Sequence, residues 1–340
     1  MISSRFVASA LTLAFGLFVT GCSAETAGDP DDLAGEGLEG LTADDAEARA
    51  EKLLAQANAN RTNFENEESL TRAQSGVAPA GLPFTEGSVG IRTLADDTRD
   101  GLGRGTWGFR FEVLDEAGRK TVLSEDKTAQ KLMGASTFKL FTGWTAFKTG
   151  STRASTLTLM LRASKNNLAN LAMCQNGEKI RGYDAACTAQ TTPTSALRMR
   201  DAIPATRSYL GEQGVGLSST FTMKDGSGLD SGNVLAIDDL TSLLEDVNAD
   251  PKRDTFLDML AQPGVSSTLV SRFSGLEGKL FAKTGTYYED GGGVKSLAGI
   301  VKLAAGKALV FAVVGNGTGD PKAALDRIEK AVRLNIDAAR

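Results

Sequence analysis

Strand patterns occupy both ends of the globular part of this 340-residue chain, and a helical region separates them. Short runs rich in β-branched, aromatic and other apolar residues predict these strands. The predicted strands are residues 88–93, 107–114, 120–123, 279–287, 294–303 and 307–315. Residues 152–262 are mainly helical by pattern, and Asp320-Pro321 predicts the start of a last helix with Leu334 on its apolar face. We therefore expect an α/β (α+β) fold, with one antiparallel sheet built from both chain ends and flanked by helices.

The first residues have the pattern of an export signal. One positive charge at Arg5 precedes an apolar run over residues 6–19, which is typical in length of a signal-peptide core. Gly21-Cys22 follows, and this ending resembles the bacterial lipobox, whose cysteine is lipidated. We expect a lipoprotein signal peptide over residues 1–21 and a lipid anchor at Cys22. A plain secretory signal with an incidental cysteine is the alternative.

The residue after Cys22 indicates which membrane a bacterial lipoprotein is sent to. Ser23 stands there, where an aspartate would signal retention in the inner membrane. We expect a periplasm-facing protein of the cell envelope, held by its lipid, with the outer membrane favoured over the inner.

An acidic segment follows the predicted signal. Residues 22–75 hold 13 acidic and 4 basic side chains and almost no aromatic ones. Such a composition buries too little apolar surface to fold alone. We expect residues 22–78 to be a flexible tether and residues 79–340 to form one catalytic domain. Within the tether, Thr42 and Asp45 have the spacing of a capping box, which predicts a short solvated helix.

If the chain is exported, its other two cysteines are in an environment that favours disulfide formation. Cys174 and Cys187 would lie in an oxidising compartment, and the polar residues 175–186 between them predict a loop. We expect a disulfide between the two, with a pair of buried free thiols as the alternative.

The chain contains no histidine and three cysteines. This composition excludes hydrolases that use imidazole as their proton carrier, and it excludes metal sites built on histidine or on four cysteines. The formal net charge of −5 is too small and of the wrong sign for a nucleic-acid-binding protein.

A serine and a lysine open the most apolar predicted helix, at residues 135–149. Ser136 and Lys139 are three positions apart, so they lie on one helix face within reach of each other. Without histidine, a buried lysine is the natural base to activate a serine. Ser124-Glu125-Asp126-Lys127 has the same spacing in a polar turn, where two carboxylates would keep the lysine protonated. An ordinary helix N-cap and a solvated lysine are the alternative interpretation of the first pair.

Two more polar motifs follow. Ser164-Lys165-Asn166 lies 28 residues after Ser136, and Lys283-Thr284-Gly285-Thr286 continues a predicted strand. A lysine and two hydroxyls on that strand would form a carboxylate-binding edge, and Gly285 would let a substrate backbone approach. Ser231-Gly232-Asn233 and Lys148-Thr149-Gly150 repeat these patterns, the first in a glycine-rich turn and the second at a helix end.

In this order, the motifs resemble the three signatures of penicillin-binding proteins and serine β-lactamases. Asp225-Gly226-Ser227-Gly228-Leu229 resembles a segment of D-alanyl-D-alanine carboxypeptidases, and Ser296-Leu297-Ala298-Gly299 resembles the S13 carboxypeptidase/endopeptidase group. The resemblance implies a β-lactamase/penicillin-binding-protein-like fold with a reduced helical region, because 28 residues leave no room for an inserted domain.

The resemblance also implies roles for the site residues. The catalytic residues would be Ser136 as nucleophile, Lys139 as its base, Ser164 as proton relay and Lys283 as a source of positive potential. Asn166, Thr284, Gly285 and Thr286 would bind the substrate. It implies peptidoglycan stem peptides and β-lactams as partners, and neither a metal nor another cofactor.

The expected activity is that of a serine-type D-alanyl-D-alanine carboxypeptidase, or of an endopeptidase, acting through an acyl-enzyme that penicillin also forms. A serine β-lactamase is one alternative, although no E-x-x-L-N segment of the class A kind lies between the second and third motifs. A non-catalytic lipoprotein that uses the same groove to hold peptidoglycan is the other.

Overall fold

The computed structural model describes residues 92–182, 193–265, 268–288 and 293–340, with the side chains of 193–198 excluded. The predicted signal peptide, the predicted helix at Thr42 and the whole of the predicted tether lie outside these ranges. Among the described helices, none has both the length and the apolar character needed to cross a membrane.

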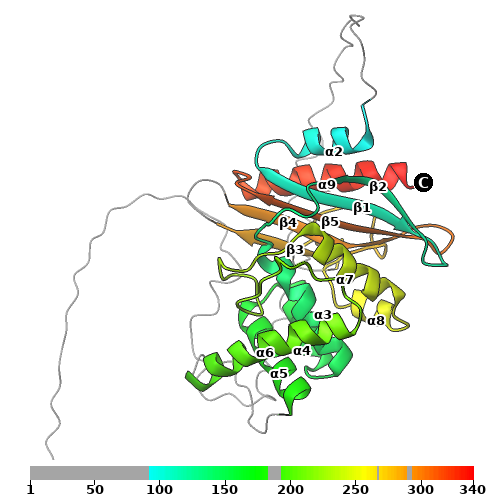
Figure 1. Ribbon diagram of the computed structural model, residues 1–340. Helices are drawn as coiled ribbons and strands as arrows, with labels where there is room; N and C mark the ends of the chain where they lie inside the picture. The colour runs from blue at the N-terminus through cyan, green and yellow to red at the C-terminus, as the bar shows by residue number, and fades with distance from the viewer. Residues whose placement is uncertain (1–91, 183–192, 266–267, 289–292) are drawn as a thin grey trace, which may run out of the picture. The chain divides into compact units, whose positions relative to one another are not determined.

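Five strands from both chain ends form one sheet, in the order β2-β1-β5-β4-β3 (Figure 1). All four pairings are antiparallel. The strands are β1 (Thr106–Leu114), β2 (Lys120–Asp126), β3 (Leu280–Tyr287), β4 (Val294–Lys302) and β5 (Ala308–Asn316). Strand β5 lies between β1 and β4, so the last strand of the chain joins the N-terminal hairpin to the C-terminal one. The expected fold class is confirmed.

Helices cover both faces of the sheet (Figure 1). One face packs on α9 (Pro321–Ala338), which also contacts α2 (Leu94–Leu102). The helices on the other side are α3 (Lys139–Thr149), α4 (Ala154–Arg162), α5 (Asn166–Arg181), α6 (Pro193–Glu212), α7 (Ile237–Ala249) and α8 (Arg253–Leu257). The 3-10 turn η2 (Ala135–Phe138) leads directly into α3.

The alternation of side chains along the strands produces two apolar cores. In β3, Phe281 belongs to the core beneath α3 and α7, whereas Leu280 and Ala282 belong to the core beneath α9. Strands β4 and β5 are buried on both faces, which explains their nearly continuous apolar sequences.

Three details differ from the sequence prediction. No strand forms at Arg92 and Thr93, because Thr93 caps α2 in a reciprocal capping box with Asp96. Residues 88–91 of that predicted strand lie outside the described ranges. The predicted loop over 175–186 is wrong up to Arg181, since α5 extends through it. Leu334 is 37% exposed and does not belong to the buried face of α9.

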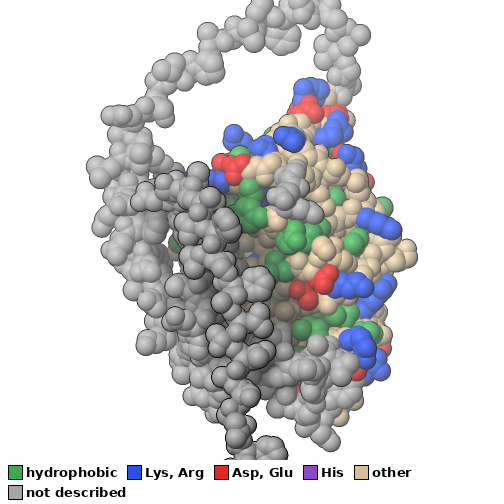
Figure 2. Space-filling model, turned by 90° about the vertical axis from the view of Figure 1, so that its left-hand side faces the viewer, with side chains coloured by type: hydrophobic (Ala, Val, Ile, Leu, Met, Phe, Trp, Pro, Cys, Tyr) green, Lys and Arg blue, Asp and Glu red, His purple; other side chains and the backbone are tan. Residues whose placement is uncertain are grey.

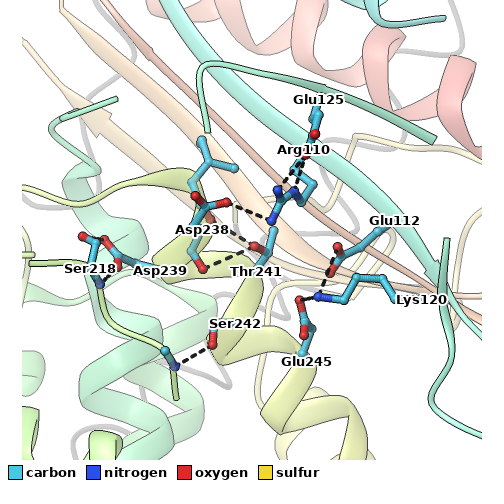
Figure 3. A network of polar contacts seen from close by, with 12 residues as sticks. Arg110, Glu112, Lys120, Glu125, Ser218, Asp238, Asp239, Thr241, Ser242 and Glu245 are labelled. Atoms are coloured by element: carbon cyan, nitrogen blue, oxygen red, sulfur yellow. Dashed lines mark hydrogen bonds and ion pairs between the residues drawn. The ribbon is translucent and has the colours of Figure 1, made fainter. Parts of the chain in front are cut away.

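A network of charged side chains joins β1, β2 and α7 (Figure 3). Arg110 of β1 pairs with Glu125 of β2 at 2.6 Å and with Asp238 of α7 at 2.8 Å. Further along the same strand, the fully buried Glu112 lies 3.7 Å from the Nζ of Lys120, which also bonds to Glu245 of α7. Neither Glu112 oxygen accepts a hydrogen bond from the described residues. A proton on Glu112 would allow it to donate to Glu245.

Burial, together with the adjacent Glu245 carboxylate, raises the pKa of Glu112 to about 8. An unfolded glutamate ionises near pH 4.5. Between these pH values the folded state binds more protons than the unfolded state, so the free energy of unfolding falls as pH rises. Glu112→Gln should remove this slope and stabilise the protein at pH 8 by on the order of 2 kcal/mol.

Urea denaturation from pH 5 to pH 9 measures the effect, with Glu116→Gln in the exposed β1–β2 turn as the control. Equal slopes in the wild type and in Glu112→Gln would contradict the assignment.

Charged side chains of both signs are interspersed over the described part of the face in Figure 2. On that face, the surface charge of the described residues does not single out a binding site. The arrangement of buried polar side chains between the sheet and the helices does.

Candidate active site

The site is built around a serine and a lysine in the turn that begins α3. Ser136 lies in η2, and Lys139 is the first residue of α3. The Nζ of Lys139 donates to the Oγ of Ser136 at 2.7 Å. Ser136 is 7% exposed and Lys139 is fully buried. Ala135 has a positive φ of 47°, a strained conformation that is frequent next to functional residues.

Lys139 also contacts two further segments. Its Nζ donates to the Oδ1 of Asn166 at 2.6 Å and to the carbonyl oxygen of Ser227 at 3.0 Å. Asn166 is the first residue of α5, and Ser227 belongs to the loop before α7. The ammonium therefore lies where α3, α5 and this loop meet.

The Ser227 loop is held in a fixed shape by its own side chains. Asp225 Oδ1 accepts the backbone N–H of Gly228 at 2.7 Å and the Nδ2 of Asn233 at 2.9 Å. Gly228 has φ 86°, and a Cβ there would lie 2.0 Å from the carbonyl oxygen of Ala135. The loop thus packs directly against the residue before the serine. The sequence analysis assigned no role to Ser227, because this residue contributes its backbone carbonyl rather than its side chain. The D-G-S-G motif around it is the sequence feature that could have indicated its position.

A second lysine and serine face each other across the site. Lys283 of β3 is fully buried, and its Nζ donates to the Oγ of Ser164 at 2.8 Å and to the carbonyl oxygen of Thr284 at 2.8 Å. Ser164 lies between α4 and α5 with φ 58°, the second strained non-glycine residue of the site.

Strand β3 approaches the serine turn closely at Gly285. A Cβ on Gly285 would lie 2.7 Å from the carbonyl oxygen of Gly134 and 3.1 Å from the backbone nitrogen of Ser136. The Oγ of Ser296 in β4 donates to the same Gly134 carbonyl at 2.7 Å. Only glycine permits this approach, which places the β3 backbone beside the candidate nucleophile.

Two hydroxyls follow Lys283 on the outer strand. Thr284 is 7% exposed, and the Oγ1 of Thr286 accepts a hydrogen bond from Lys295 of β4 at 2.6 Å. Burial, and the nearby Arg272 guanidinium, lower the pKa of Lys295 to about 8. Sequence reasoning missed Lys295, because its proximity to Thr286 depends on the β3–β4 register.

The structure thus brings together the side chains expected from the three motifs. The Ser136–Lys139–Asn166 contacts and the Lys283–Ser164 contact join motifs that are far apart in the chain.

Cys174 of α5 takes part in a disulfide. Its expected partner Cys187 lies outside the described residues, as does Cys22.

The repeated motifs have structural partners instead. The buried Oγ of Ser124 donates to Asn335 of α9 at 2.6 Å. Lys148 pairs with Asp250 and lies over the Trp144 ring, and Gly150 ends α3 in the left-handed conformation. Asn233 holds the Asp225 turn.

This arrangement supplies the groups that acyl transfer requires. A serine hydroxyl is bonded to an amine that can take its proton, and a second lysine is bonded to a second serine. The backbone nitrogen of Ser136 lies close to Gly285 of β3, so the backbone of this strand borders the serine where an oxyanion would form. The described residues contain no cluster of cysteine and carboxylate side chains that could hold a metal ion.

Comparison with known proteins defines the class first. A β-lactamase from Chitinophaga pinensis is similar in fold with a TM-score of 0.54 over 73% of this chain and 99% of that one, at 16% identity. The fold is therefore β-lactamase-like. Within it, the model of the D-Ala-D-Ala carboxypeptidase 3 (S13) family matches residues 154–337, more than half of the chain. The chain belongs to the S13 family.

Two relatives are similar over shorter stretches. A D-alanyl-D-alanine carboxypeptidase of Actinomadura sp. (strain R39) is 34% identical over 129 residues, which are 36% of this chain and 23% of that protein. Penicillin binding protein 4 of Haemophilus influenzae is 24% identical, with a TM-score of 0.42 over 52% of this chain and 38% of that one. The matches thus span well under half of each relative's length.

Proposed function

We propose that this protein is a serine-type D-alanyl-D-alanine carboxypeptidase that acts on peptidoglycan stem peptides through an acyl-enzyme and is acylated by penicillin. The observation that carries the proposal is the Lys139 ammonium, which bonds to Ser136, Asn166 and the Ser227 carbonyl in a buried site. Membership of the S13 family and the D-alanyl-D-alanine carboxypeptidase activity in the name of the Actinomadura relative support the substrate class.

In the first half-reaction, the Oγ of Ser136 attacks the carbonyl carbon of the peptide bond between two D-alanines. Lys139 takes the hydroxyl proton along the 2.7 Å hydrogen bond. This step needs the neutral amine form of Lys139. The backbone N–H groups of Ser136 and Thr286 stabilise the oxyanion, an effect typically worth about 3 kcal/mol per donor.

The leaving D-alanine must receive a proton at its amine. Ser164 relays this proton, and Lys283 orients the Ser164 hydroxyl by donating to it at 2.8 Å. Asn166 accepts from Lys139 with its Oδ1, so its Nδ2 is the atom that donates to the substrate amide. Thr284 and Thr286 bind the terminal carboxylate of the substrate. Water then cleaves the ester on Ser136 and restores the hydroxyl.

The experiment compares three activities of the purified full chain: release of D-alanine from a peptide that ends in D-alanyl-D-alanine, covalent labelling by a fluorescent penicillin, and turnover of nitrocefin. We expect D-alanine release, labelling with one penicillin per chain and slow nitrocefin turnover. Rapid nitrocefin turnover without D-alanine release would identify a β-lactamase. Absence of all three activities would leave the non-catalytic peptidoglycan-binding function.

We also propose that Cys22 carries a lipid and holds the domain at the periplasmic side of a cell-envelope membrane. The proposal is supported by the apolar run at residues 6–19, by Gly21-Cys22 and by the acidic composition of residues 22–75. In this arrangement the tether would let the site reach peptidoglycan away from the membrane surface.

A further inference from the structure

A buried lysine on β4 lies beside β3, the strand that carries Thr284 and Thr286. Lys295 of β4 is directly opposite Thr286 in the antiparallel register. The Lys295 side chain is 8% exposed, and its Nζ donates to the Oγ1 of Thr286 at 2.6 Å. Because burying an ammonium is costly, a lysine at this position calls for an explanation beyond packing.

The direction of this hydrogen bond decides what Thr286 can do. A lysine ammonium only donates, so the Thr286 oxygen must accept. The hydroxyl hydrogen of Thr286 then has to point elsewhere, and it is available to an acceptor outside the strand. Lys295 thereby makes Thr286 a hydrogen-bond donor for an acceptor that binds beside this strand.

The Lys295 ammonium supplies positive charge for an incoming anion. Arg272 acts on Lys295 as a second positive charge, although it is itself paired with Asp326 and lies 3.8 Å from Glu329, and Asp320 at the start of α9 acts on Lys295 as a negative charge. A carboxylate bonded to the Thr286 hydroxyl would lie within about 5 Å of the Lys295 Nζ, two hydrogen-bond lengths away. At that distance a partly buried ammonium attracts a carboxylate appreciably.

We propose that Lys295 is a positioning and specificity residue for the terminal carboxylate of the substrate: it orients the Thr286 hydroxyl as a donor and adds positive charge behind it. This inference rests on the proposed function, since it concerns how the same site selects acids. It predicts that Lys295 affects ligands with a free carboxylate and leaves those with a masked carboxylate unaffected.

The experiment measures the second-order acylation rate of the full chain by benzylpenicillin and by benzylpenicillin methyl ester. Lys295→Met should slow acylation by the acid by about 10- to 100-fold and leave acylation by the ester unchanged, and Lys295→Arg should restore most of the acid rate. Lys302→Met is the matched control. It lies on the same strand, pairs with Asp254 and covers Phe281, and it should change neither rate.

Equal losses with acid and ester, or no loss with the acid, would overturn the inference while leaving the proposed function intact. A wild-type chain that neither compound acylates would instead refute the proposed function, and the inference with it.

A second measurement on the wild type covers the case in which Lys295→Met does not fold. Lys295 loses its charge as pH rises through about 8, so the acid-to-ester rate ratio should fall between pH 7 and pH 9.5. A ratio that stays constant over this range overturns the inference.

Discussion

Ser136→Ala should abolish covalent labelling by penicillin and reduce D-alanine release by more than about 1000-fold, because the substitution removes the attacking oxygen. The variant should remain folded, since the Ser136 hydroxyl is a small group whose described partner is the Lys139 ammonium. Labelling with a fluorescent penicillin, followed by mass spectrometry of the labelled peptide, measures the effect and locates the adduct.

Ser124→Ala is the matched control, because Ser124 begins a motif with the same spacing. Its hydroxyl is buried against Asn335, so its loss should lower the free energy of unfolding by about 1 kcal/mol and leave labelling unchanged. An adduct on any residue other than Ser136, or full labelling of Ser136→Ala, would refute the assignment of the nucleophile.

Lys139→Met and Lys139→Arg should each slow acylation by about 100- to 10,000-fold, the range expected for loss of a general base. The two substitutions separate two roles of the lysine. Methionine removes both the charge and the basicity, whereas arginine keeps a positive charge that cannot be given up near neutral pH. Inactivity of both variants would therefore assign proton transfer to Lys139. The acylation rate constant is the quantity to measure, with circular dichroism as the check on folding.

Lys148→Met controls for the loss of a lysine from the same helix. Lys148 pairs with Asp250 and lies 5.3 Å from the centroid of the Trp144 ring, so its loss should cost about 1 kcal/mol of stability and no activity. Substantial activity of Lys139→Arg would show that Lys139 acts through its charge rather than as a base.

The strands were predictable because their apolar sequences reflect burial. Strands β4 and β5 are covered on both faces, and their nearly continuous apolar runs identified them. Helix α2 was missed, because it has few apolar residues and depends on the Thr93–Asp96 capping box. The loop expected after Cys174 is largely helix, since Gly177, which suggested a loop, packs closely against Ala202 of α6 and the residues after it are good helix formers.

The part of the site that was predictable from the sequence consists of side chains that belong to short motifs. Ser136, Lys139 and Asn166 are one such set, and the structure places them within hydrogen-bond distance. The Ser227 carbonyl and the Lys295 ammonium were not predictable in the same way. Every residue has a backbone carbonyl oxygen, so its role cannot be recognised from the residue type. The partner of a lysine on a strand is set by the strand register, which depends on the whole sheet.

The position of β5 has a consequence for how the chain acquires its activity. Because β5 is bonded to both β1 and β4, a ribosome must produce residue 316 before the two hairpins can join. Pairings between residues some two hundred positions apart form slowly, since a long loop must close first. A product of premature termination before residue 308 would contain Ser136, Lys139, Ser164 and Lys283 and still lack the central strand that joins the two halves of the sheet.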